Sequence, residues 1–241
     1  MNWQPFSLHF KQSFSDGYRY LDKCGEFILA AKKHDFMPGE ITVTGGQLVI
    51  PEHLFTANVN SQELVTRQEL PTDFAFFSGK SMILANLAGE HFGLLDIQSN
   101  VFSVKWYWPT GSPEEALSKS LKLKEKLQDE LAKSLGMVPA SARTDLNFSS
   151  GNLDLHVVLQ AVAFENVTVQ QHNAPFGATR EQKTRVSRLR QHRQVFPQDL
   201  GHAVFLEIDL KELDPPVNSL EKHFGLLETK SDILVERLSL S

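Results

Sequence analysis

The stretch from residue 101 to residue 136 constrains the fold of this chain most, because it combines a strand pattern with a strongly marked helix. Along residues 101–108 large apolar side chains alternate with others, and side chains on a strand alternate between its two faces. This spacing predicts a half-buried antiparallel strand. Its apolar face would carry Phe102, Val104, Trp106 and Trp108, and its other face Ser103, Lys105 and Tyr107.

A long amphipathic helix is expected directly after this strand. Ser112 is suited to be the N-cap, Pro113 to occupy the first helical position, and Glu115 to complete a capping box. Gly136 is suited to end the helix. Leucines on one side of this helix, with lysines and acids on the other, predict that it lies on the sheet. The leucine stripe comprises Leu117, Leu121, Leu131 and Leu135.

Other segments add strands and helices that fit the same arrangement. One helix is predicted after Ser15 or Asp16, with the sole cysteine, Cys24, inside its apolar stripe, and another over residues 72–89, where Gly89 would end it. Strands are predicted in the segments 6–10, 40–43, 47–50, 54–59, 63–70 and 202–210, a hairpin over 92–108, and one long strand or a bent pair over 153–170. The chain is therefore expected to be an α+β protein, with antiparallel sheets and helices packed mainly on one face.

A possible internal repeat suggests how the chain divides. A constant shift of 103 residues places Pro113 on Pro216 and aligns several leucines of the two helices that follow. One hypothesis is two related halves, each ending in a strand–turn–long helix unit; the alternative is that any two leucine-rich, capped helices match this well. The expected division is an α+β half over 1–136, a linker over 137–151 and a second half over 152–241.

Composition limits the class of protein further. With 41% hydrophobic residues and 22% charged residues, 241 residues are enough for sizeable cores, and 17 phenylalanines predict that the core is rich in aromatic rings. A net charge of −5 argues against nucleic-acid binding over the whole surface. No signal sequence or membrane span is recognisable, so we expect a soluble, cytoplasmic protein without membrane contact. The single cysteine fits a reducing compartment.

No motif for catalysis or cofactor binding stands out. The segment 78–81, Ser-Gly-Lys-Ser, resembles the end of a phosphate-binding loop, but Phe74 stands where that loop needs glycine and the segment falls inside a predicted helix. Nine histidines show no metal-ligand spacing. Glu207 and Asp209 share one face of a strand, and an exposed strand face explains them without catalysis. We expect no cofactor and no metal, and favour a non-enzyme.

One basic segment, residues 180–193, could bind a partner. It holds six cations against the single acid Glu181, and arginine side chains can fork onto phosphates or carboxylates. The structural alternative is a solvated helix or loop balanced by acidic surface elsewhere. The candidate partner-binding residues are Arg180, Lys183, Arg185, Arg188, Arg190 and Arg193.

The absence of motifs favours a non-catalytic binding or scaffolding protein that recognises a macromolecular partner, with a protein partner or self-association expected. Two alternatives stay open. The first is an accessory protein that contacts nucleic acid through residues 180–193, which predicts binding that weakens steeply with salt. The second is an enzyme of unknown class whose residues meet only in the fold, which predicts a pocket that holds a perturbed histidine or acid.

Overall fold

A single antiparallel sheet of nine strands organises the protein. The computed structural model describes residues 3–71, 73–94, 96–122, 143–163, 202–215 and 219–239. The strand order across the sheet is β2-β3-β4-β5-β1-β6-β9-β8-β7. The strands are β1 (Gln4–Phe14), β2 (Met37–Ile41), β3 (Gly46–Ile50), β4 (Phe55–Val59), β5 (Glu63–Glu69), β6 (Ile97–Thr110), β7 (Arg143–Ser150), β8 (Leu153–Ala163) and β9 (His202–Leu213).

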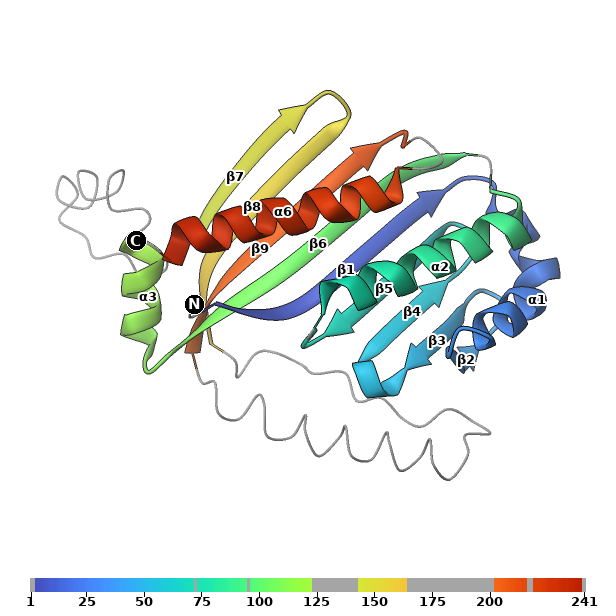
Figure 1. Cartoon of the computed structure of the whole chain (residues 1–241), viewed down its shortest axis with the longest axis horizontal. Coiled ribbons are helices and arrows are strands. Elements are labelled where there is room, and N and C mark those ends of the chain that lie inside the picture. The colour runs from blue at the N-terminus through green and yellow to red at the C-terminus, as the bar shows by residue number, and fades with distance from the viewer. Residues whose placement is uncertain are drawn as a thin grey trace.

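Four described α-helices pack on one face of this sheet, which confirms the predicted α+β class and helix placement. They are α1 (Tyr20–Lys32), α2 (Phe74–Phe92), α3 (Pro113–Lys122) and α6 (Leu220–Ser239). Helices α2 and α6 cross the same side of the sheet, with α1 beside α2 (Figure 1). Helix α3 contacts β8 and β9 near one end of these strands. In the described part of the chain, no helix has the length and apolar character needed to cross a membrane.

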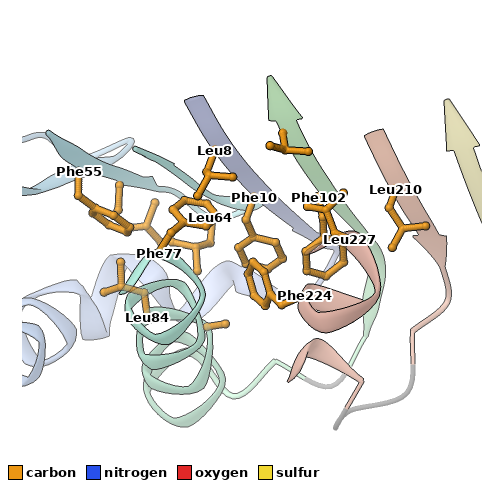
Figure 2. Packing of buried hydrophobic residues seen from close by; sticks show 14 of the residues in the cluster. Leu8, Phe10, Phe55, Leu64, Phe77, Leu84, Phe102, Leu210, Phe224 and Leu227 are labelled. Atoms are coloured by element: carbon orange, nitrogen blue, oxygen red, sulfur yellow. The ribbon is translucent and has the colours of Figure 1, made fainter. Parts of the chain in front are cut away.

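The hydrophobic core lies between the helices and the sheet and is rich in phenylalanine, as the composition predicted. Strand pairing sets Phe10 of β1 opposite Phe102 of β6, and Phe102 opposite Leu210 of β9. The ring of Phe224 on α6 packs against this row, with its centroid 4.8 Å from that of Phe102 and 5.3 Å from that of Phe10 (Figure 2). Phe77 of α2 also contacts Phe224, at 6.0 Å, so the two helices and the sheet meet at one aromatic cluster.

The strand and helix cap predicted from residue 101 onward are both present. Phe102 and Val104 are buried on the helix-covered face of β6. The Glu115 amide donates to the Ser112 hydroxyl at 3.2 Å, while the Glu115 carboxylate accepts from the Gly111 amide at 2.8 Å. The helix N-terminus is therefore capped at Ser112, and Glu115 reaches one residue further back than a capping box requires.

The predicted leucine stripe of this helix needs correction in its described part. Ala116 and Ser120 are the buried residues of α3, whereas Leu117 and Leu121 are only half-buried. A small residue allows the helix backbone to approach the sheet closely, which a leucine at the same position would prevent. Leu131, Leu135 and Gly136 lie outside the described residues.

Helix α2 extends beyond its predicted end. Gly89 is helical, and the helix ends at Gly93, which has a φ of 68° and whose amide donates to the carbonyl of Gly89 at 3.0 Å. Glycine adopts this left-handed conformation without steric cost, so Gly93 forms the C-cap. The N-terminus agrees with prediction, because the Asp73 carboxylate accepts from the amide of Ala75 at 2.9 Å.

The structure does not confirm the internal duplication. A shift of 103 residues aligns Phe102, on the helix-covered face of β6, with Phe205, on the opposite face of β9. The two strands therefore cannot correspond without an added residue. Residues 143–150 of the predicted linker form β7, which belongs to the same sheet as β1 to β6. The division into 1–136 and 152–241 stays a prediction.

Candidate functional site

The basic segment that sequence analysis favours lies outside the described residues. This applies to Arg180, Lys183, Arg185, Arg188, Arg190 and Arg193, whose role in binding stays a prediction. Cys24 lies in α1, is half-buried and packs against the hydrophobic core, in agreement with a packing role.

The segment that resembles a phosphate-binding loop lies inside α2, as predicted. The Lys80 ammonium donates to the carbonyl oxygen of His34 at 2.7 Å and lies 3.3 Å from the carboxylate of Asp35. It also lies 5.5 Å from the ring centroid of Phe36. Lys80 therefore ties α2 to the end of α1, and these contacts give it a structural role.

A buried polar cluster joins β9 to the start of α6. The Glu212 carboxylate accepts a hydrogen bond of 3.0 Å from the Ser219 hydroxyl, and the same oxygen lies 2.9 Å from Nδ1 of His223. The exposed fraction of Glu212 is 2% and that of His223 is 4%. The contact between the two is an ion-pair approach without the alignment of a hydrogen bond.

The order of contacts in this cluster decides what it can do. In a serine nucleophile–histidine–acid arrangement, the histidine lies between the hydroxyl and the carboxylate. Here Glu212 is central, and both Ser219 and His223 contact it. The Ser219 hydroxyl donates directly to the Glu212 carboxylate, and no hydrogen bond joins it to His223, so this cluster has the geometry of a structural tie between strand and helix. Among the described residues, no three His, Cys, Asp or Glu side chains are grouped to hold a metal ion.

The face of the sheet opposite the four described helices, which we call the open face, carries most of the charged strand residues. None of the described helices lies on it (Figure 1). Strand pairing brings His9 between Arg67 and Ser103, and brings Asp209 between Ser103 and His156. The charged and histidine residues of the open face are Glu63, Arg67 and Glu69 on β5, His9 and Lys11 on β1, Lys105 on β6, Glu207, Asp209 and Lys211 on β9, Asp154 and His156 on β8, and Arg143 and Asp145 on β7.

Opposite charges on the open face pair across neighbouring strands. The Lys105 ammonium lies 2.9 Å from the Glu207 carboxylate, joining β6 to β9. The ring of His156 lies between two carboxylates, with Nε2 3.2 Å from Asp145 and Nδ1 3.6 Å from Asp209. These carboxylates approach opposite nitrogens of one ring, so they do not converge on a common metal position.

Further ion pairs lie towards both sides of the sheet, one across neighbouring strands and two within a single strand. Lys11 pairs with Glu63 at 2.5 Å, and Arg67 with Glu69 at 3.6 Å. On β7 the guanidinium of Arg143 holds the pKa of the Asp145 carboxyl below its usual range. Lysines and arginines are thus nearly balanced by carboxylates over the described open face.

His9 lies near the centre of the open face and experiences an unusual environment. Burial lowers its pKa below the ordinary value, and the positive charges of Arg67, Lys105 and Lys11 lower it further, while Asp209 opposes them. The neutral imidazole is therefore the favoured form near pH 7. A neutral histidine adds no charge to the balanced pattern around it.

One end of the open face is aromatic instead of charged. Tyr107, expected on the exposed side of β6, is only 2% exposed. Its ring lies 5.9 Å from that of Phe6 and 6.5 Å from that of Phe205, and Phe6 lies 5.0 Å from Phe205. Tyr107 lies on the predicted face of β6. However, side chains at this end of the open face are more deeply buried than those of an exposed strand face.

Sequence reasoning places Glu207 and Asp209 on one strand face, and the structure confirms this. It does not identify Glu212 as buried. The sequence does contain a signal for this, because Glu212 continues the apolar series Leu206, Ile208 and Leu210 with the same period of two. No signal within one segment could show that His223 or Ser219 meets it.

No protein-family model matches the chain, and no curated protein matches it.

Proposed function

We propose that this chain is a non-catalytic binding or scaffolding protein that recognises a macromolecular partner, and that it associates with a second copy of itself through the open face. The observation that supports this most directly is the pairing of Lys105 on β6 with Glu207 on β9. Cations and carboxylates alternate across the centre of a broad surface that no described helix covers.

Such a pattern is complementary to itself. In a twofold dimer the same patch is used by both copies, so that residue i of one copy meets residue j of the other and the reverse. A lysine of each copy can then face a carboxylate of the other, so the same contact forms at two symmetric positions. An exposed ion pair within a chain contributes only about 0–1 kcal/mol to stability. If these side chains also contact a partner, the folded monomer therefore loses little stability.

Charge balance also bears on the nucleic-acid alternative. A phosphate backbone is bound by concentrated positive charge, and carboxylates such as Glu207, Asp209 and Asp145 would repel it. The described open face therefore favours a protein partner. Contact with nucleic acid through residues 180–193 remains the alternative proposal, and an enzyme with an unrecognised site remains the second.

Sedimentation velocity over a range of protein concentrations tests self-association. We expect the wild type to sediment faster as concentration rises, and Lys105→Glu or Glu207→Lys each to weaken association by at least about tenfold, because like charges would meet at two symmetric positions. The double variant Lys105→Glu/Glu207→Lys restores opposite charges within the chain and across the dimer, so it should recover association.

Matched controls change charge away from the open face. Lys222→Glu and Glu221→Lys make the same changes at exposed positions of α6. They should leave association unchanged. A wild type that stays monomeric at every concentration, or single reversals that behave like these controls, would show that the open face is a solvated surface and would reject the proposal.

A further inference from the structure

A small pocket lies on the helix-covered side of the sheet, between the first turn of α2 and the middle of α6. Its volume is about 200 Å³. Its floor consists of side chains from β1 and β6, and its rim carries three carboxylates. The floor residues are Pro5, Leu8, Val104 and Trp106; Pro71, Phe74 and Ser231 form the walls, and Asp73, Glu228 and Asp232 lie at the rim.

The aromatic part of the floor is held in place. The indole nitrogen of Trp106 donates a hydrogen bond of 2.6 Å to the hydroxyl oxygen of Ser231. Ser231 is 2% exposed, so this hydrogen bond is sheltered from water. The contact fixes the indole beneath α6, and a fixed aromatic ring is ready to receive a ligand without the cost of ordering it.

The rim carboxylates have no cationic partner among the described residues. Asp73 accepts the hydrogen bond that caps α2 and is stabilised there by the helix dipole, but no described lysine or arginine forms an ion pair with it. Glu228 and Asp232 face the same pocket from neighbouring turns of α6, and no described lysine or arginine forms an ion pair with either. An apolar, aromatic floor is thus combined with a rim of three carboxylates that form no ion pair with the described lysines and arginines.

Size and chemistry together limit what this pocket can take. Sites for drug-sized ligands have volumes of roughly 300–1,000 Å³, so the space here fits a group the size of a side chain. The negative rim disfavours phosphates and carboxylates. The described residues provide no group of metal ligands, which favours an organic cation. Aromatic faces attract ammonium groups, and a lysine stem can lie along apolar surface while its charge stays near the rim.

We propose that this pocket binds the side chain of a lysine presented by a partner polypeptide. Its methylene stem would lie against Leu8, Val104 and Trp106, and its ammonium group would lie between Asp73 and the two acids of α6. This inference goes beyond self-association through the open face, because the pocket is on the other side of the sheet. The two surfaces can be occupied together, and each can fail without the other.

Nuclear magnetic resonance of the full chain labelled with ¹⁵N tests the assignment. The indole N–H signal of Trp106, identified by its loss in Trp106→Phe, reports on the pocket, while those of Trp3 and Trp108 serve as references. The probes are lysine blocked as Nα-acetyl-lysine N-methylamide, the same compound acetylated at Nε, and n-butylammonium. We expect the blocked lysine to shift the Trp106 signal in a saturable way and the acetylated compound to leave it unchanged.

Charge-neutral variants test the role of the rim. Asp232→Asn and Glu228→Gln should each weaken binding of the blocked lysine by roughly fivefold, the effect of one partly screened ion pair. Glu236→Gln removes an exposed acid from the same helix outside the pocket and should have no effect. The dispersion of the remaining amide signals shows whether each variant is folded, and either rim variant alone is sufficient for the test.

Several results would overturn the proposal. Equal shifts with blocked lysine and its acetylated form would show that charge is not recognised. A response to n-butylammonium without one to the blocked lysine would indicate a site for small free amines, closed to a side chain. An unmoved Trp106 signal with all three probes would mean that the pocket takes no alkylammonium group.

Discussion

The carboxylate of Glu212, near the end of β9, accepts a 3.0 Å hydrogen bond from the hydroxyl of Ser219, directly before α6. Both residues are buried, and His223, one turn into the helix, contacts the same carboxylate oxygen at 2.9 Å. A negative charge at a helix N-terminus is also favoured by the helix dipole. The cluster therefore fixes where α6 begins relative to the sheet.

Removal of this carboxylate should be costly for stability. Glu212→Leu leaves the buried Ser219 hydroxyl without its acceptor, at a cost of about 1–3 kcal/mol, and removes the carboxylate beside the buried ring of His223. Glu212→Gln retains an oxygen that can accept from Ser219, so its loss should be smaller. Urea unfolding at pH 7 measures both. Equal stability of Glu212→Leu and the wild type would show that the cluster does not hold α6 in place.

The aromatic cluster around Phe224 offers a second test. Phe224 on α6 contacts Phe10, Phe102 and Phe77, which come from two strands and another helix. Phe224→Ala should lower the free energy of unfolding by about 3–5 kcal/mol, because the cavity would lie between closely packed rings. Phe224→Leu fills part of this space and should cost less. If both variants unfold at the wild-type urea concentration, α6 does not close the core.

Local patterns suffice for much of this fold. The alternation in residues 101–108, the N-cap at Ser112 and the N-cap at Asp73 are each encoded within a few residues, and all are observed. The same holds for the class of fold, since short alternating segments predict antiparallel strands and the amphipathic segments predict helices on one face.

The candidate sites depend on contacts that no local pattern encodes. Trp106 and Ser231 are 125 residues apart, and they meet only because β9 pairs with β6 and α6 then crosses back over the sheet. The ion pair between Lys105 and Glu207 depends on the register of the same two strands. Strand order and register are set by the packing of the whole core, so sequence reasoning could name these residues but could not bring them together.

The packing of α3 shows how the helix face can differ from a leucine pattern. Ala116 is 2% exposed, while Leu121 is half-buried. Ala116→Leu should therefore destabilise the protein by about 1–3 kcal/mol through overpacking. Leu121→Ala should cost less than the 2–5 kcal/mol typical of a fully buried leucine. Thermal unfolding of both variants checks this ranking, and the reverse order would restore the leucine stripe as the buried face.

The last prediction concerns the pH dependence of stability and rests on His9. Burial lowers the pKa of His9 in the folded protein, and the nearby cations Arg67, Lys105 and Lys11 add to this effect, with Asp209 opposing it. Above the unfolded value of 6.5, the histidine is neutral in both states and its contribution to stability is complete. As pH falls below 6.5, the unfolded chain takes up the proton first, so stability decreases towards the folded pKa.

Replacement of His9 by glutamine should remove this part of the pH dependence, because glutamine binds no proton in either state. Urea unfolding at pH 7.5 and pH 5 gives the change in free energy for each protein, and we expect a smaller change for His9→Gln than for the wild type. His34→Gln, at an exposed position, controls for the loss of one imidazole from the chain. An identical pH dependence in His9→Gln and the wild type would mean that the cations of the open face do not act on His9, and that the centre of this face is more accessible to water than its burial indicates.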